Sequence, residues 1–114
     1  MQIQVVKTGY LEENCYILEQ NNKVLVIDPG DDYLKIKEKI GTNKVLAFLI
    51  THSHYDHVGA LDELLNDYPV EVIDFNSTKI ENNLESFEFN IISTKGHSSD
   101  SITFYFPKEK LMFC

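Results

Sequence analysis

Four potential metal ligands lie within six positions, directly after the apolar run 45–50: His52, His54, Asp56 and His57. The apolar run is typical of a strand that is covered on both faces. In an extended backbone His52 and His54 point to the same side, because side chains alternate, and the two can chelate one metal ion. The bend that follows can aim Asp56 and His57 at a second ion. Imidazole and carboxylate ligands suit Zn²⁺, in one or two sites, with Fe or Mn as alternatives.

The fourth histidine is predicted to complete this cluster. His97 follows the strand-like run 87–93, and Gly96 lets the backbone turn so that the ring can project inward. Because the other three histidines are gathered in one segment, His97 is predicted as a ligand beside His52 and His54. A core does not hold so many polar groups without partners, so the alternative to a metal site is a solvated loop.

The rest of the chain predicts a mixed α/β fold. Short β-branched or aromatic runs predict strands over residues 3–6, 15–18, 24–27, 45–50, 70–73, 87–93, 101–106 and 111–114. Apolar residues at helical spacing predict two main helices, from a cap at Asp31 or Asp32 to Ile40 and from Ala60 to Tyr68. The polar stretch 76–85 is predicted to be a loop.

Composition fits one small domain of 114 residues and excludes several classes of partner. Eighteen acidic residues against ten lysines give a formal net charge of −8, so nucleic acid would be repelled. No apolar run approaches the roughly 20 residues of a membrane span, and the first residues do not resemble a signal peptide. Cys15 and Cys114 form no disulfide framework, and a cytoplasmic location is therefore expected.

Three motifs of the sequence resemble those of one known family. The segment from His52 to His57 (His-x-His-x-Asp-His), Asp28-Pro29-Gly30 and Gly96-His97-Ser98 resemble the motifs of the metallo-β-lactamase superfamily. The likeness is strongest to its glyoxalase-II-like (hydroxyacylglutathione hydrolase-like) branch, which Asn14-Cys15-Tyr16 also resembles. The resemblance implies that residues 1–114 form a single truncated domain, the N-terminal half of an αββα sandwich with a mixed β-sheet.

Carried over position by position, the resemblance implies roles for five residues. His52, His54 and His97 would bind the first metal, and Asp56 and His57 the second. Asp28 ends a strand in the same region and could orient the site by accepting a hydrogen bond from a ligand imidazole or from the loop backbone. An Asx-type turn at Asp28 is the alternative, and the sequence leaves both open.

The implied activity is that of a metal-dependent hydrolase. A hydroxide held by the metals would attack an ester, thioester or related carbonyl of a small-molecule substrate. In the family, an aspartate that bridges both metals and a last histidine follow the strand that matches Leu111–Cys114, and both lie beyond these 114 residues. The chain by itself is therefore expected to be weakly active or inactive. A non-catalytic metal-binding or interaction module is the alternative.

Other members of the superfamily fit less well. The absence of arginine and the acidic balance weigh against a nuclease. His54 weighs against the flavin-linked diiron oxidoreductases, which usually carry glutamate there, and His57 weighs against a β-lactamase proper. Lys95 replaces a common proline, and the interval from His57 to His97 is short, which leaves the substrate open. Since the last strand would expose apolar residues, a homodimer is expected, with strand exchange as one way of forming it.

Overall fold

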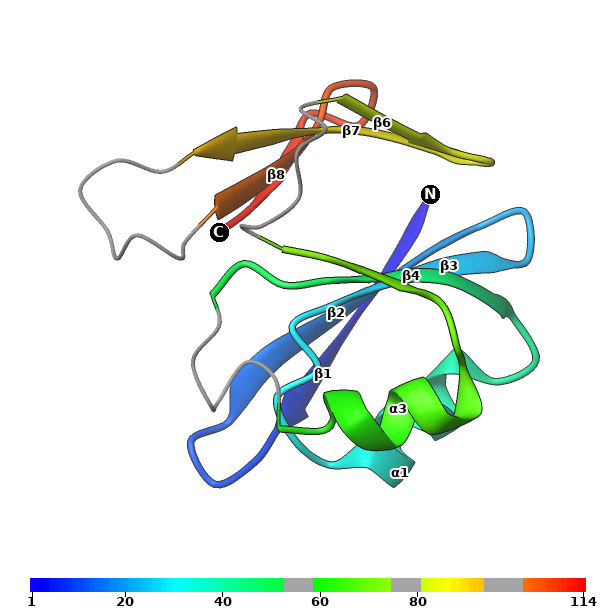
Figure 1. Ribbon diagram of the computed structural model, residues 1–114, viewed down its shortest axis with the longest axis vertical. Coiled ribbons are helices and arrows are strands. Elements are labelled where there is room, and N and C mark those ends of the chain that lie inside the picture. The colour runs from blue at the N-terminus through cyan, green and yellow to red at the C-terminus, as the bar shows by residue number, and fades with distance from the viewer. Residues whose placement is uncertain (53–58, 75–80, 94–101) are drawn as a thin grey trace.

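The computed structural model describes residues 1–52, 59–74, 81–93 and 102–114, with the backbone alone at 81–83 and 93 (Figure 1). In chain order the elements are β1 (Gln2–Thr8), β2 (Glu13–Gln20), β3 (Lys23–Ile27), α1 (Tyr33–Ile40), β4 (Lys44–Leu49), α3 (Leu61–Asp67), β5 (Glu71–Ile73), β6 (Glu81–Leu84), β7 (Phe87–Ser93), β8 (Ile102–Phe106) and β9 (Leu111–Phe113). They form a layer of helices and two sheets, as expected for half of an αββα sandwich.

The first sheet is mixed, in the order β1-β2-β3-β4-β5. Strands β1, β2 and β3 pair antiparallel through short turns, whereas β3 pairs parallel with β4, and β4 parallel with β5. The ladder continues beyond the strand ends, because the Asp28 N–H donates to the Leu49 carbonyl and the Ile50 N–H donates to the Ile73 carbonyl. The carboxyl ends of β3, β4 and β5 therefore meet at one edge of the sheet.

Helices α1 and α3 cover one face of this sheet (Figure 1). Their apolar residues recur at helical spacing, so Ile36, Ile40 and Leu64 are buried against strand residues such as Phe48. Asp67 joins the two helices by accepting hydrogen bonds from the Tyr33 hydroxyl and the Lys37 ammonium. Both predicted helices are thus confirmed. In the described part of the chain, no helix is long and apolar enough to cross a membrane.

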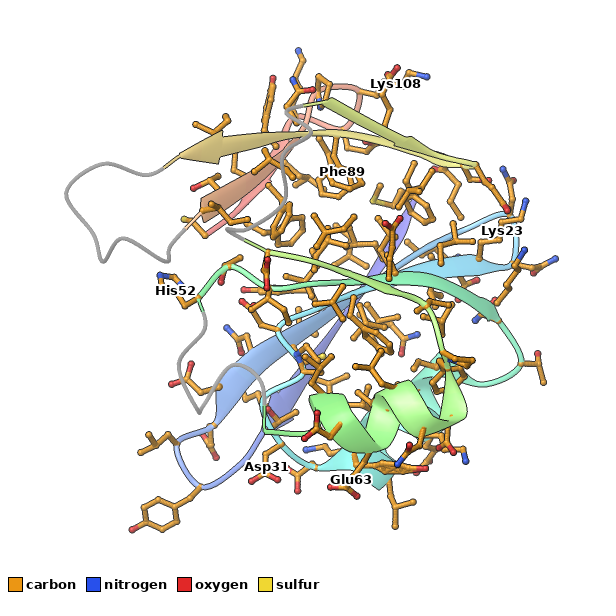
Figure 2. The ribbon with its side chains drawn as sticks, in the orientation of Figure 1. Lys23, Asp31, His52, Glu63, Phe89 and Lys108 are labelled. Carbon is orange, nitrogen blue, oxygen red and sulfur yellow. The ribbon has the colours of Figure 1, made fainter. Side chains whose placement is uncertain are left out.

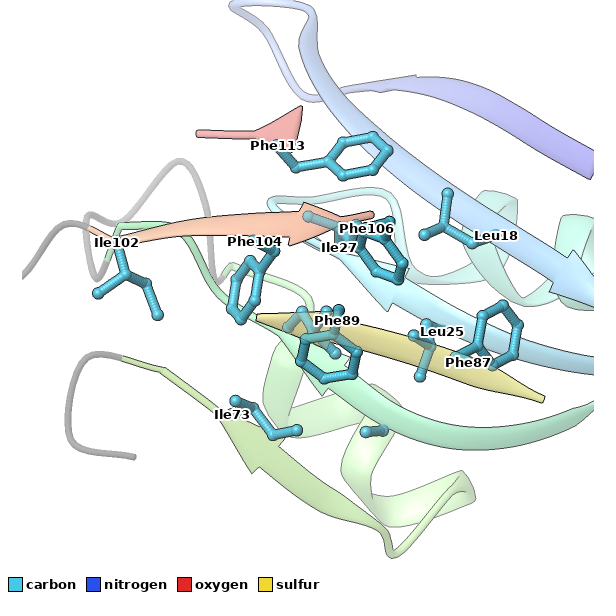
Figure 3. Packing of buried hydrophobic residues seen from close by; sticks show 12 residues of the cluster. Leu18, Leu25, Ile27, Ile73, Phe87, Phe89, Ile102, Phe104, Phe106 and Phe113 are labelled. Atoms are coloured by element: carbon cyan, nitrogen blue, oxygen red, sulfur yellow. The ribbon is translucent and has the colours of Figure 1, made fainter. Parts of the chain in front are cut away.

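The second sheet, in the order β6-β7-β8-β9, is antiparallel and covers the opposite face of the first (Figure 1). Between the sheets lies an apolar core that is rich in phenylalanine (Figure 3). The ring of Phe89 is fully buried and lies 5.2 Å from the Phe106 centroid and 5.9 Å from the Phe104 centroid. Phe113 packs on Tyr16, with centroids 5.0 Å apart, so that β9 contacts the first sheet at β2.

Ion pairs join the two sheets at the end opposite the carboxyl ends of β3 and β4. Glu85, in the turn between β6 and β7, lies 3.0 Å from the Lys23 ammonium and 3.3 Å from that of Lys44. Hydrogen bonds from Lys23 and then Lys44 lower the pKa of Glu85. Because the carboxylate is exposed, these pairs add little to stability but favour one alignment of the two sheets.

One local prediction was wrong, and a second was confirmed in part. The stretch predicted to be a loop contains β6, which pairs with β7 through a tight turn in which Glu85 has a φ of 45°. A polar edge strand of this kind is stabilised by backbone pairing, which apolar patterning does not detect. Asp32 is the N-cap residue of α1, as predicted, but its side chain makes no capping hydrogen bond; its carboxylate accepts a hydrogen bond from the Gly9 N–H at 2.8 Å instead.

Candidate metal centre

The candidate site lies at the edge where the three parallel strands end. Asp28 follows β3, Thr51 and His52 follow the continuation of β4, and Asp74 follows β5. Figure 2 shows His52 at this edge, at the opposite end of the sheet from Lys23. Carboxyl ends of parallel strands are where ligand-binding groups commonly gather, since they bring separate loops together.

A chain of hydrogen bonds connects three of these residues. The Asp28 carboxylate accepts the Thr51 backbone N–H at Oδ1, over 2.8 Å, and the Thr51 hydroxyl at Oδ2, over 2.6 Å. The same hydroxyl oxygen lies 2.9 Å from Nδ1 of the His52 imidazole. Asp28 and Thr51 are both buried, whereas His52 is partly exposed. A buried carboxylate is thereby linked to a histidine that reaches solvent.

The backbone conformation of Asp28 directs its carboxylate toward Thr51. Its φ is 54°, in the left-handed region, which aspartate tolerates better than most residues. The Asp28 carboxylate accepts a hydrogen bond from the backbone that leads into the loop, since the Thr51 N–H donates to it. Its connection to the His52 imidazole runs through the Thr51 hydroxyl. That Asp28 orients a metal site stays a prediction.

Thr51 also ties the second sheet to this edge. Its carbonyl accepts the N–H of Ile102, the first residue of β8, at 2.9 Å. The backbone on both sides of the interface is therefore fixed next to His52. Sequence reasoning did not single out Thr51; the available signal was a hydroxyl residue between a buried strand and the first histidine.

Cys15 lies in β2 beneath this edge. Burial raises the pKa of its thiol, and the nearby Asp28 charge raises it further. The thiol is therefore neutral at physiological pH, and the interpretation of Cys15 as a small buried residue is confirmed. Within the described ranges, Cys15 and Cys114 are both free.

Of the predicted metal ligands, the structure places His52. The other four, His54, Asp56, His57 and His97, lie outside the described residues, and their roles remain predictions. Among the residues that are described, no three His, Cys, Asp or Glu side chains are grouped to hold a metal ion. The surroundings of His52 nevertheless fit a metal ligand, because ligating histidines ordinarily use their second ring nitrogen in a hydrogen bond to an oxygen.

A cavity of about 380 Å³ lies beside the Asp28 turn. The turn between β1 and β2 and the segment after Asp28 form its walls: Thr8, Gly9, Tyr10, Leu11, Glu13, Gly30 and Asp31. Tyr10 is 99% exposed and Leu11 is 68% exposed. Apolar side chains that protrude in this way beside a cavity offer a contact surface for a ligand.

Comparison with known proteins agrees with this architecture. Residues 8–74 match the family model of the metallo-beta-lactamase superfamily. A hydroxyacylglutathione hydrolase of Chromohalobacter salexigens is 31% identical over 93% of this chain and 48% of its own length. Among solved structures, the BLEG-1 B3 metallo-beta-lactamase matches with a TM-score of 0.91 and 21% identity, over 98% of this chain and 70% of that one. TTHA1623 in a di-iron-bound form matches with a TM-score of 0.82 and 25% identity, over 96% and 70%.

The chain spans about half the length of the hydroxyacylglutathione hydrolase that it matches. The family model covers more than half of the chain and includes β3, β4 and the predicted ligands from His52 to His57. The fold, the Asp28–Thr51–His52 hydrogen bonds and the family match lead to one conclusion. This chain belongs to the metallo-beta-lactamase superfamily.

Proposed function

We propose that this chain carries the metal-binding part of a metal-dependent hydrolase that acts on thioesters or related esters. The observation that carries the proposal is the hydrogen-bonded series Asp28–Thr51–His52, which holds an imidazole at the carboxyl ends of the parallel strands. Such support from a buried carboxylate is typical of metal-binding histidines. Zn²⁺ is the proposed ion, with Fe or Mn as alternatives.

The residues of this chain position the reaction, and the metal supplies its chemistry. Asp28 fixes the Thr51 backbone, and Thr51 holds the His52 ring at the edge of the sheet. When bound, a divalent ion acidifies water, which provides a nucleophile at neutral pH, and polarises a carbonyl. Such a reaction requires no nucleophilic side chain. In this proposal, the described polar groups at this edge of the sheet orient the site, and none of them attacks the substrate.

The remaining predicted ligands are close in sequence to His52 or to a residue that is hydrogen-bonded to Thr51. His54, Asp56 and His57 follow within five residues. His97 precedes Ile102 by five residues, and the Ile102 N–H donates to the Thr51 carbonyl. Five residues span at most about 18 Å, so the length of the chain allows His97 to reach this edge. This allowance in the sequence supports the proposal that His97 completes the site with His52 and His54.

A hydroxyacyl thioester is the substrate class that we favour. The relative from Chromohalobacter salexigens is a hydroxyacylglutathione hydrolase, and sequence similarity to it extends over almost the whole of this chain. The cavity between the β1–β2 turn and Gly30–Asp31 would receive part of such a substrate, with Tyr10 and Leu11 in contact with its apolar portion.

Metal content tests the site directly. We expect the purified chain to retain zinc after dialysis against metal-free buffer, as measured by inductively coupled plasma mass spectrometry. His52→Ala and His97→Ala should each lose most of that metal, because each removes an imidazole ligand. The control is Asp62→Ala, which removes an exposed carboxylate in the first turn of α3 and should leave the metal content unchanged.

Two outcomes of that measurement would count against the proposal. Equal metal content in all three variants would show that neither histidine is a ligand. Retained metal without any turnover of a hydroxyacylglutathione thioester, even in a chain extended to the length of its relatives, would favour the non-catalytic module instead.

We further propose that the 114-residue chain associates with a second copy through the edge strand β1. Ile3 and Val5 are 41% and 54% exposed. They lie opposite Leu18 and Tyr16 in the ladder, so they extend the apolar face that is packed against the second sheet. An exposed apolar edge strand favours pairing with another chain.

We also propose a cytoplasmic location for the protein. The free thiols agree with this location.

Light scattering after size exclusion, at tens of micromolar protein, tests the association through β1. We expect the mass of a dimer for the wild-type chain and that of a monomer for Val5→Lys, because a charge on the edge strand opposes pairing. Leu34→Lys on α1, at a residue that is 75% exposed, is the matched control and should remain dimeric. A monodisperse wild-type monomer would contradict the proposal.

A further inference from the structure

The hydroxyl of Thr51 contacts two groups that differ in whether they can donate or only accept a hydrogen bond. Its oxygen lies 2.6 Å from Oδ2 of Asp28 and 2.9 Å from Nδ1 of His52. The side chain is fully buried, so solvent does not compete for these contacts. The hydroxyl has a single proton, which it can donate to one partner only, while its lone pairs can accept from another.

The carboxylate determines where that proton goes. Asp28 accepts at both oxygens, from the Thr51 N–H at Oδ1 and from the hydroxyl at Oδ2. A carboxylate offers no proton in return, so the Thr51 hydroxyl must be the donor in the 2.6 Å contact. The contact with His52 is then a hydrogen bond only if Nδ1 of the imidazole carries the proton.

We infer that Thr51 is a positioning residue that selects the Nδ1–H tautomer of His52 and thereby presents Nε2, without a proton, as the metal-binding nitrogen. Metal ligation requires an unprotonated nitrogen, and the hydrogen bond at the other nitrogen decides which one that is. The inference rests on the proposed role of His52 as a ligand. It adds which nitrogen binds and which residue decides it.

The tautomer is measurable before any metal is added. We would record long-range ¹H–¹⁵N correlation spectra of metal-free, ¹⁵N-labelled protein at about pH 8.5, where imidazole is ordinarily neutral. The signals of His52 are identified by their loss in His52→Ala. We expect the Nδ1–H pattern in the wild-type protein, which is the opposite of the tautomer that free histidine prefers.

Two substitutions of Thr51 separate hydrogen bonding from packing. Thr51→Val keeps the shape of the side chain without the hydroxyl, and we expect the Nε2–H tautomer and zinc affinity weakened about 10–100-fold, as for other partners of metal-binding histidines. Thr51→Ser keeps the hydroxyl and should retain the Nδ1–H pattern and an affinity near that of the wild type. A purely structural role for Thr51 would not change the tautomer.

The possible outcomes distinguish this inference from the proposed function. A wild-type His52 in the Nε2–H form, or a Thr51→Val protein with the wild-type tautomer and affinity, would overturn the inference. An Nδ1–H tautomer in a protein that binds no metal would support the selection of the tautomer by Thr51 and reject the metal site. The wild-type spectrum and its assignment with His52→Ala do not depend on Thr51→Val, so the test remains decisive even if Thr51→Val does not fold.

Discussion

Phe89→Ala is expected to lower the free energy of unfolding by about 3–5 kcal/mol, the usual cost of removing a buried aromatic ring from a core. The ring is fully buried between the two sheets and packs on Phe104 and Phe106. Domains of this size are stable by only about 5–15 kcal/mol, so the loss would take much of the total. Urea denaturation followed by far-ultraviolet circular dichroism measures it.

The controls for Phe89→Ala separate cavity formation from general sensitivity. Phe89→Leu fills most of the space and should cost clearly less than the alanine substitution. Tyr10→Ala, at a side chain that is 99% exposed, should change the free energy of unfolding by less than about 0.5 kcal/mol. A loss for Phe89→Ala as small as that for Tyr10→Ala would mean that the sheets do not pack as described.

The elements that could be predicted from the sequence are those that bury a regular pattern. The apolar run that became β4 is packed on both faces, with Phe48 toward the helices and Leu49 toward the second sheet. The leucine spacing of α3 was equally decisive, because Leu64 had to face the sheet. In each case burial at a fixed period determines the element.

Features that depend on contacts between distant segments could not be predicted in this way. Strand β6 is held by backbone pairing with β7, and Asp32 binds the Gly9 N–H, which is remote in sequence. Thr51 acquires its role only when β3 and β4 lie parallel and bring Asp28 beside it. Local secondary-structure propensity contains no information on contacts between residues that are distant in sequence. A known family motif, in contrast, indicates which strand ends lie together.

For the candidate metal site, the sequence predicted five ligands, and the structure shows the hydrogen-bonded surroundings of one of them, His52. His52 lies where the motif predicted it, at the end of a buried strand, and Asp28 lies within two hydrogen bonds of its ring. The predicted set of five ligands extends beyond the described residues, and metal analysis of the histidine variants is the direct test of it.

Asp28→Ala is the substitution at the site with the largest expected effect on stability. It removes the acceptor of the Thr51 N–H and of the Thr51 hydroxyl, both of which are buried. Each buried donor that loses its partner costs about 1–3 kcal/mol, and loss of the buried charge offsets a part, so we expect a net loss of about 3 kcal/mol. Urea denaturation of the metal-free protein measures it without a contribution from metal binding.

Asp28→Asn is the matched variant, because it keeps the shape and one acceptor oxygen. Its carbonyl can still accept the Thr51 N–H, so we expect a loss of only about 1 kcal/mol. Its amide, however, would donate to the Thr51 hydroxyl, which frees the hydroxyl proton for Nδ1 of His52. The variant should then show the Nε2–H tautomer in a folded protein. Equal stability of Asp28→Ala and the wild type would contradict the hydrogen bonds on which this reasoning depends.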